Sequence, residues 1–135
     1  MLRQHDPDFI DGNHIAVFDN NTRFNTNDNA AYSRILRIAV PSNTVEEIYK
    51  GSPTEAFYTA TLGKQQWLAN GNILFSNNEK GEAKEITRDG ETVWHFANLI
   101  NASHTAAIQE VARLPEFMNK AWFNELANNC QEANK

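Results

Sequence analysis

The fold of this chain is decided by a stretch that occurs twice: FIDGNHIAVFDN at residues 9–20 and WLANGNILFSN at residues 67–77. Each copy has an apolar pair, a turn that contains Gly-Asn, and then an apolar run that favours a β-strand. Asp-Gly and Asn-Gly between apolar runs are strong hairpin signals, because Gly and Asn tolerate the positive φ of a tight turn. Each copy therefore predicts a β-hairpin, and the repeat predicts that one local architecture is used twice.

Both copies continue in the same way. Residues 33–40 alternate apolar and polar side chains, as a half-buried strand does, and residues 81–87 do so less regularly. Turns are expected next at 41–43 and 88–90, and they are followed by closing strands at 44–49 and 91–96. Four short strands per copy predict a mainly β chain with two tandem four-stranded antiparallel meanders, each resembling the blade of a propeller.

We expect a single domain, because a chain of this length can bury one core. Its sections are the first meander at 4–51, with a loop insertion at 21–31, the second meander at 56–97, and a C-terminal connection and helix at 98–135.

The C-terminal part changes character. Pro115 suits the first position of a helix, and apolar residues recur at helical spacing after it. We therefore expect a helix at about 115–129 that buries Phe117, Trp122 and Leu126 against the β-structure.

Composition excludes several classes of protein. The net charge is −5 and no cluster of Lys and Arg occurs, which argues against a nucleic-acid partner, because phosphates need a basic surface. Cys130 is the only cysteine, so neither an intramolecular disulfide nor a cysteine-rich metal site is expected. No apolar run approaches the roughly 20 residues of a membrane span. We expect no membrane partner and no cofactor.

Six short segments occur in an order that is typical of one family. They are QHDPDF at 4–9, AVFDN at 16–20, YSRI at 32–35, QWLANGNIL at 66–74, EITRDGETVW at 85–94 and ARLP at 112–115. In this order they resemble the bacterial arylsulfotransferase family, from its "QHD" and "FDN" motifs to its closing "R-x-P" segment. Since "NGN" alone signals only a hairpin, the ordered series carries the resemblance.

The resemblance implies a six-bladed β-propeller that moves a sulfuryl group from a phenyl sulfate ester to a phenol. It implies that the transfer uses no nucleotide sulfate donor and passes through a sulfated histidine, which His5 matches. The family's other site histidines and arginine lie on earlier blades, so this chain resembles the last two blades and the tail. We expect it in the cytoplasm if Met1 is the natural start, and in the periplasm or secreted if it is part of a full-length member.

His5 leads the candidate catalytic residues. A neutral imidazole nitrogen can act as the nucleophile, because the pKa of histidine lies near 6.5. Asp6 and Asp19 are the candidates to orient the ring by accepting its other N–H. Arg34 is the candidate to clamp a sulfonate, although strand arginines beside acidic hairpins favour the alternative, an ion pair with Asp19 or with a neighbouring strand's carboxylate.

The insertion at 21–31 is rich in Asn and Thr, and long insertions of this kind often carry function. Asn20 and Asn21, at its start, are our candidates to bind a small aromatic or sulfated ligand. No metal is expected, because the histidines follow no zinc-binding spacing and the Asn- and Asp-rich stretch lacks the register of a calcium loop.

Two interpretations of function follow. Two blades cannot close a propeller ring, which favours a truncated or standalone segment that acts as a non-catalytic, oligomeric binding or assembly module. The alternative is an enzyme, or part of one, that transfers a sulfuryl group from an aryl sulfate to a phenol through a sulfohistidine. We expect a homo-oligomer, most simply a two-fold symmetric dimer, while three such chains would supply six blades.

Overall fold

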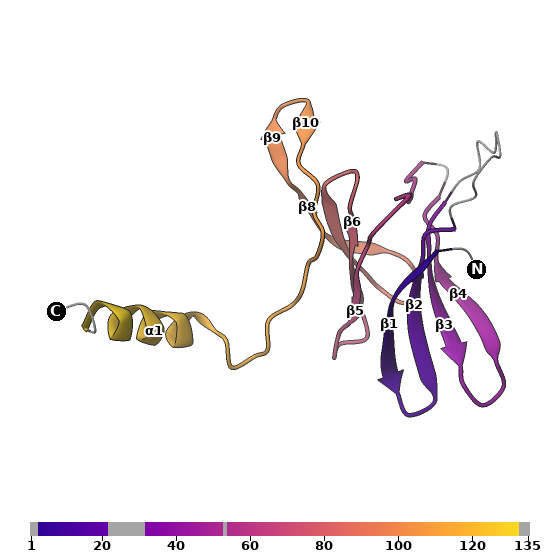
Figure 1. Cartoon of the computed structure of the whole chain (residues 1–135), viewed down its shortest axis with the longest axis horizontal. Coiled ribbons are helices and arrows are strands. Elements are labelled where there is room, and N and C mark those ends of the chain that lie inside the picture. Colours follow the sequence, from indigo (N-terminus) through magenta and orange to yellow (C-terminus); the bar gives the residue numbers. More distant parts are fainter. Residues whose placement is uncertain (1–2, 22–31, 53, 133–135) are drawn as a thin grey trace.

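The computed structural model of the chain describes residues 3–21, 32–52 and 54–132. Two four-stranded antiparallel sheets follow each other along the chain (Figure 1). Sheet 1 consists of β1 (Gln4–Asp11), β2 (His14–Asp19), β3 (Arg34–Ala39) and β4 (Thr44–Tyr49). Sheet 2 consists of β5 (Gln65–Trp67), β6 (Ile73–Asn77), β7 (Glu82–Ile86) and β8 (Thr92–Ala97). The predicted mainly β fold with two four-stranded meanders is confirmed, and the described strands form no closed barrel.

Two further elements follow sheet 2. A small two-stranded sheet, which was not expected, is formed by β9 (Leu99–Asn101) and β10 (His104–Thr105). The helix α1 (Lys120–Glu132) is the last element described. No helix in the described part of the chain is long and apolar enough to cross a membrane.

The two hairpin signals form the first turn of each sheet. Between β1 and β2 the Asp11 carboxylate accepts a hydrogen bond from the backbone N–H of Asn13 at 2.7 Å. Between β5 and β6 the backbone of Leu68 bonds to that of Asn72 at 2.9 Å, and Gly71 has a φ of 88°. Such a φ favours glycine, because a Cβ atom would be strained there.

The core lies between the two sheets. Phe18, Ile35 and Tyr49 from sheet 1 form one cluster with the buried residues Ile73, Phe75 and Ile86 from sheet 2. Phe57, from the linker between the sheets, completes it: its ring centroid lies 5.4 Å from Phe18, 5.3 Å from Tyr49 and 4.8 Å from Phe75. Tilted and edge-on aromatic pairs at such distances add to the stabilisation from burial. The first sheet therefore packs face to face on the second through aromatic side chains.

The linker passes very close to sheet 1. Gly63 has a φ of 104°, and a Cβ atom at this position would overlap the ring of Phe18. A side chain is thus excluded both by the backbone conformation and by the space available. This close approach lets the chain run from the core directly into β5.

The segment after β10 lies along sheet 2 before it leaves the body of the molecule. The side-chain amide of Asn78 donates to the carbonyl of Ile108 at 2.9 Å. The side chain of Gln66 accepts from the backbone N–H of Arg113 at 2.7 Å and donates to its carbonyl at 3.4 Å. Residues 106–114 are therefore held to sheet 2 by side chains of β5 and of the β6–β7 turn.

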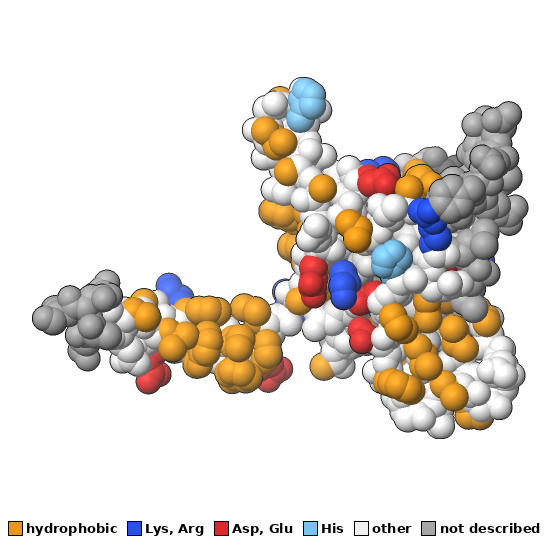
Figure 2. Space-filling view, viewed as in Figure 1, with side chains coloured by type: hydrophobic (Ala, Val, Ile, Leu, Met, Phe, Trp, Pro, Cys, Tyr) orange, Lys and Arg blue, Asp and Glu red, His pale blue; other side chains and the backbone are white. Residues whose placement is uncertain are grey.

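The C-terminal helix differs from the prediction in two respects. It begins at Lys120 rather than Pro115, because the side chain of Asn119 accepts hydrogen bonds from the backbone N–H groups of Ala121 and Trp122 and so caps it. The expected burial is wrong for Phe117, which is 61% exposed, and for Leu126, which is 43% exposed. Trp122 is half-buried, in contact with the rings of Phe117 and Phe123. The helix projects away from both sheets, and its apolar side chains are visible on the surface (Figures 1 and 2).

Candidate functional site

His5 lies at the distorted start of β1. It pairs with Phe18 of β2, and directly opposite residues in an antiparallel pair point to the same side of the sheet. The ring therefore belongs to the face that carries Phe18 and Ile35. It is half-buried, and no hydrogen-bond or ion-pair partner is found for it among the described residues. Positive φ angles at Arg3 and Asp6 (59° and 49°) flank it.

Asp6 joins the start of sheet 1 to the start of sheet 2. Its carboxylate accepts hydrogen bonds from the Lys64 ammonium at 2.8 Å and from the backbone N–H of Gln65 at 2.7 Å. The Gln65 side chain also donates to the Asp6 carbonyl at 3.2 Å. The hydrogen bond from Lys64 to this carboxylate raises the pKa of Lys64. The structure thus places Asp6 in a contact between the sheets, with no hydrogen bond to His5.

Asp19 and Arg34 form an ion pair across β2 and β3. Asp19 is fully buried, and the Arg34 guanidinium lies 2.5 Å from its carboxylate and 3.5 Å from that of Glu47 on β4. Burial lowers the pKa of Arg34, but hydrogen bonding to Asp19 and its charge outweigh this and raise it. The alternative for Arg34 was an ion pair with Asp19 or with a neighbouring strand's carboxylate, and the structure shows a contact with each. Asp19 and Arg34 follow directly after the paired residues Phe18 and Ile35 in the β2–β3 pairing. Because successive side chains along a strand point to opposite faces, the ion pair lies on the face opposite to His5.

Asn20 ties the end of β2 to the linker. It is fully buried, and its side-chain amide donates to the carbonyls of Thr59 and Leu62, each at 2.8 Å. The Ser33 hydroxyl donates to the Thr59 carbonyl at 3.1 Å and accepts from the Thr59 N–H at 3.0 Å. Sequence reasoning missed this network. The "FDN" motif therefore supplies one core ring, one buried ion-pair partner and one amide that anchors the linker.

Asn21 begins the insertion that the sequence marked as a ligand site. Its backbone N–H donates to the Asp19 carboxylate at 3.1 Å, and its φ is 50°. Asn tolerates this left-handed conformation better than most residues. The rest of the expected loop, 22–31, lies outside the described residues.

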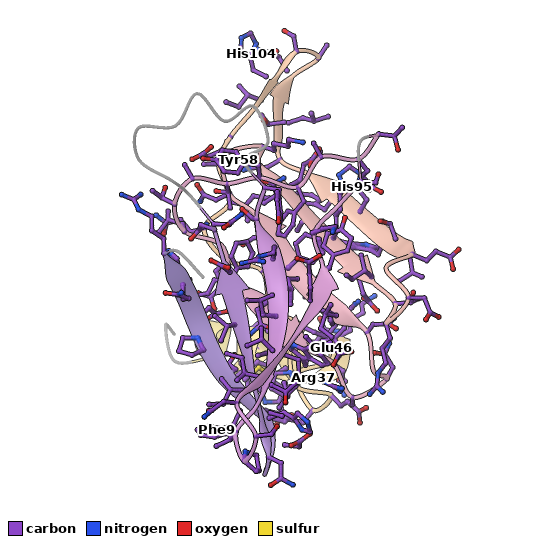
Figure 3. The ribbon with its side chains drawn as sticks, turned by 90° about the vertical axis from the view of Figure 1, so that its right-hand side faces the viewer. Phe9, Arg37, Glu46, Tyr58, His95 and His104 are labelled. Carbon is purple, nitrogen blue, oxygen red and sulfur yellow. The ribbon has the colours of Figure 1, made fainter. Side chains whose placement is uncertain are left out.

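The other histidines lie apart from one another. His14 contacts the Asp11 carboxylate at 2.8 Å, and His104 contacts the side chain of Asn101 at 3.0 Å. His104 lies at the tip of the small sheet, away from His95 (Figure 3). Within the part of the chain that the structure describes, no group of three potential metal ligands occurs.

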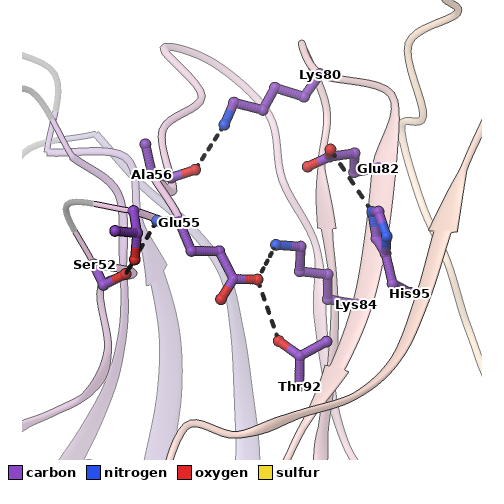
Figure 4. Close-up of polar contacts among 9 residues, drawn as sticks. Ser52, Glu55, Ala56, Lys80, Glu82, Lys84, Thr92 and His95 are labelled. Carbon is purple, nitrogen blue, oxygen red and sulfur yellow. Dashed lines mark hydrogen bonds and ion pairs between the residues drawn. The ribbon is translucent and has the colours of Figure 1, made fainter.

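A polar cluster between the linker and sheet 2 was also missed by sequence reasoning (Figure 4). Glu55 accepts hydrogen bonds from the Lys84 ammonium at 2.5 Å and from the Thr92 hydroxyl at 3.3 Å. The hydrogen bond from Lys84 lowers the pKa of Glu55. The Lys80 ammonium donates to the carbonyl of Ala56 at 2.7 Å. These contacts fasten the linker to sheet 2, so the cluster fixes how the sheets are placed.

An apolar hollow lies on the far face of sheet 2. It is lined by Leu74, Trp94, Val111, Ala112, Arg113 and Leu114. Beside it, Trp94 and Phe96 are stacked with ring centroids 6.2 Å apart, and both are more than two-fifths exposed. The only sequence signal for this surface was the alternation along β8, which puts two aromatic rings on one face.

Comparison with known proteins agrees with the sequence motifs. A family model described as Arylsulfotransferase (ASST) matches residues 1–99. The matched region covers every strand of both four-stranded sheets. No curated protein and no solved structure gave a match.

Proposed function

Because the chain belongs to the arylsulfotransferase (ASST) family, we propose that it is a two-blade propeller segment that acts as a non-catalytic, homo-oligomeric binding and assembly module. One observation supports this most: the side chains expected to assist His5 are engaged in structural contacts. Asp6 is bound by Lys64 and Gln65, and Asp19 is paired with Arg34 on the other face of the sheet.

This arrangement engages two cations of the described residues, Arg34 and Lys64, with carboxylates instead of with a sulfonate at His5. Sulfuryl transfer develops negative charge on the sulfonate oxygens, and positioned cationic donors are needed to stabilise it. Arg34 neutralises buried Asp19, and register places it away from the His5 face. The Lys64 ammonium is bound to Asp6. A small aromatic or sulfated ligand is thus more readily bound by this chain than turned over.

A second candidate function is the enzyme itself, and the state of the His5 ring favours it. The ring is half-buried and has no partner among the described residues, so a ring nitrogen is available to attack. In that reaction an N–S bond forms while the bond between sulfur and the aryl oxygen breaks, and the phenolate leaves. The oxygen of an acceptor phenol then attacks sulfur, restores the histidine and loses its proton to solvent.

Incubation with 4-nitrophenyl sulfate separates the two candidates. For the module we expect no release of nitrophenol, no intact-mass increase of one sulfonate group, and identical results with the His5→Ala variant. Labelling of the unaltered chain that disappears in His5→Ala would establish the enzyme and reject the module. A His104→Ala variant, altered at an exposed histidine on β10, controls for nonspecific sulfation and should behave like the unaltered chain.

A further inference from the structure

The two sheets can be aligned row by row from their strand pairing, where a row is the set of residues directly opposite one another. One row of sheet 1 consists of Phe9, Ile15, Ile38 and Val45, which we call the Phe9 row. The row at the same place in sheet 2 consists of Trp67, Ile73, Ile86 and Thr92. Both rows cross all four strands and lie next to the first hairpin turn. They are therefore equivalent positions in the two repeats.

The equivalent row in sheet 2 is buried inside the molecule. Ile73 and Ile86 are fully buried, and Trp67 packs against the same cluster. Their partners are Phe18, Ile35 and Tyr49, a row on the facing side of sheet 1. The chain thus contains one complete example of how a row of this kind is covered by the preceding sheet.

The Phe9 row itself is not covered in the same way. Phe9 is 77% exposed and Val45 48%, while Ile15 and Ile38 are half-buried. Strand alternation places this row on the face of sheet 1 that points away from sheet 2. Hydrophobic side chains gather over the lower part of sheet 1 in Figure 2, and Phe9 lies at its lower end in Figure 3. An apolar row of this extent is typical of an interaction surface.

The other end of the molecule offers the matching surface. The row of sheet 2 that corresponds to Phe18, Ile35 and Tyr49 is Ser76, Ala83 and Phe96. Phe96 therefore takes the place of Tyr49, and Trp94 lies two residues away on the same face. We call the surface that Trp94 and Phe96 form beside the buried side chains of Leu74 and Ala83 the Trp94 face. Phe96 is 48% exposed, whereas its counterpart Tyr49 contacts Phe75 of the next sheet. The Trp94 ring beside it is 41% exposed.

The path of the chain repeats as well. The Asn20 side chain holds the linker by donating to the Thr59 carbonyl, and the Asn78 side chain holds the segment after sheet 2 by donating to the Ile108 carbonyl. Ser33 and Gly81 are equivalent positions in the two sheets. The backbone N–H of Ser33 donates to the carbonyl of Phe57, and Gly81 lies so close to Ala106 that a Cβ atom on the glycine would overlap the Ala106 carbonyl. Residues 106–114 thus cross the Trp94 face of sheet 2 in the way that residues 57–65 cross sheet 1. In sheet 1 this path leads into the next sheet, so the Trp94 face has the surroundings of a surface on which another sheet packs.

From this equivalence we propose that the Phe9 row of one chain packs on the Trp94 face of a second copy. The contact between copies repeats the contact between sheet 1 and sheet 2 within the chain. The partner is a second copy because both halves of the contact are present on each chain, at opposite ends of the sheet pair. This inference rests on the proposed assembly function and specifies the surfaces that carry it.

The contact is head-to-tail and so departs from the two-fold symmetric dimer expected from the sequence. In a two-fold dimer one patch contacts the same patch of its partner, whereas here two different patches meet. Each added copy leaves one Phe9 row and one Trp94 face available. Such an assembly grows beyond two copies until it closes into a ring, and three copies would provide six sheets.

Single substitutions at each end test the contact. We choose Val45→Asp for the Phe9 row and Phe96→Asp for the Trp94 face, because both side chains are about half exposed and the fold tolerates them. Sedimentation equilibrium should show the unaltered chain above the mass of a dimer. Each variant alone should associate at least about tenfold more weakly, because a charge would be buried at a contact centre.

Mixing the two variants is the decisive measurement. Each retains one intact surface, so an equimolar mixture should form a dimer and stop there. Ile100→Asp on β9, at a residue 68% exposed and outside both surfaces, should leave assembly unchanged. A monomeric unaltered chain, equal dissociation by Ile100→Asp, or a mixture that stays monomeric would overturn the contact. Histidine sulfation by an aryl sulfate, in contrast, would reject the module function whatever the state of assembly.

Discussion

Two arginines on β3 show how much the surroundings of a residue decide its role. Arg34 pairs with a carboxylate that is fully buried, whereas Arg37 pairs at 2.7 Å with Glu46, whose side chain is 55% exposed. Water screens the second pair and solvates either partner if the other is lost. Loss of Arg34 would leave a buried charge without its main counter-charge.

We therefore expect Arg34→Met to lower the free energy of unfolding by about 3 kcal/mol. Arg37→Met is the matched control on the same strand and should cost less than about 1 kcal/mol. Urea denaturation measures both. Adding Asp19→Asn to Arg34→Met should restore part of the loss, and equal effects of the two single variants would contradict the argument.

Glu85 gives the fold a dependence on pH. Its carboxylate accepts a hydrogen bond from Asn72 at 2.7 Å, which is the main cause that lowers its pKa below the ordinary 4.5. Burial raises the pKa, while Asn70 and the Arg113 guanidinium lower it further. A carboxylate with a lowered pKa stabilises the fold fully above the pKa of the unfolded chain, and this contribution is lost as pH falls through the lower folded value.

We expect the urea midpoint of the unaltered chain to fall as the pH drops below about 4.5, with a smaller fall in Glu85→Gln. Glu46→Gln, which removes an exposed carboxylate, should keep the dependence of the unaltered chain. The measurement is the midpoint at a series of pH values. Identical slopes in Glu85→Gln and the unaltered chain would remove Glu85 from the explanation.

At the scale of elements, α1 shows that amphipathic spacing does not specify where a helix starts or what it packs on. Apolar residues continue upstream through Phe117 to Pro115, but the backbone becomes helical only after Asn119 supplies a side-chain oxygen to two N–H groups. Because the helix projects from the sheets, its stability depends mainly on such local terms.

Asn119→Ala should therefore reduce the helical signal in far-UV circular dichroism, by a loss of about 1 kcal/mol in helix stability. Asn119→Asp should keep the signal, because an aspartate caps equally well. Asn124→Ala, inside the same helix, should raise it slightly, since alanine has the higher helix propensity. A reduced signal in Asn124→Ala as well would contradict the capping argument.

At the scale of the whole molecule, Phe57 joins the two sheets. It is 3% exposed and contacts aromatic rings of β2, β4 and β6, although it belongs to the linker. The polar contacts of Glu55 and Asn20 fix the linker on either side of it. Sheet packing therefore depends on a residue that lies outside both sheets.

Phe57→Ala should lower the free energy of unfolding by about 3–5 kcal/mol, because it leaves a cavity among three rings. Phe117→Ala removes the same side chain at a position 61% exposed and should cost less than about 1 kcal/mol. Chemical denaturation followed by tryptophan fluorescence measures both. A small effect of Phe57→Ala would mean that the packing of the two sheets does not depend on the Phe57 ring.

The strands and hairpins could be predicted from the sequence because their signals are local. Asp11-Gly12-Asn13 and Asn70-Gly71-Asn72 specify turns through their own backbone preferences, and alternation specifies strands within a few residues. The motif series identified the family for the same reason, since each motif coincides with a strand or turn. The pairing of Arg34 with Asp19 was also within reach, because adjacent strands of one meander bring them together.

The surroundings of the candidate site depended on the packing of one sheet on the other. Asp6 contacts Lys64 across 58 residues of sequence and Asn20 contacts Thr59 across 39. No local spacing encodes such pairs, because they form only when two separately folded sheets meet. The burial of Asn20 follows from that contact, whereas the face on which His5 lies follows from the pairing of β1 with β2. The repeat thus specified two similar sheets. Their packing buried the row of Phe18 in sheet 1 and the row of Trp67 in sheet 2, and it left the equivalent Phe9 row and Trp94 face exposed.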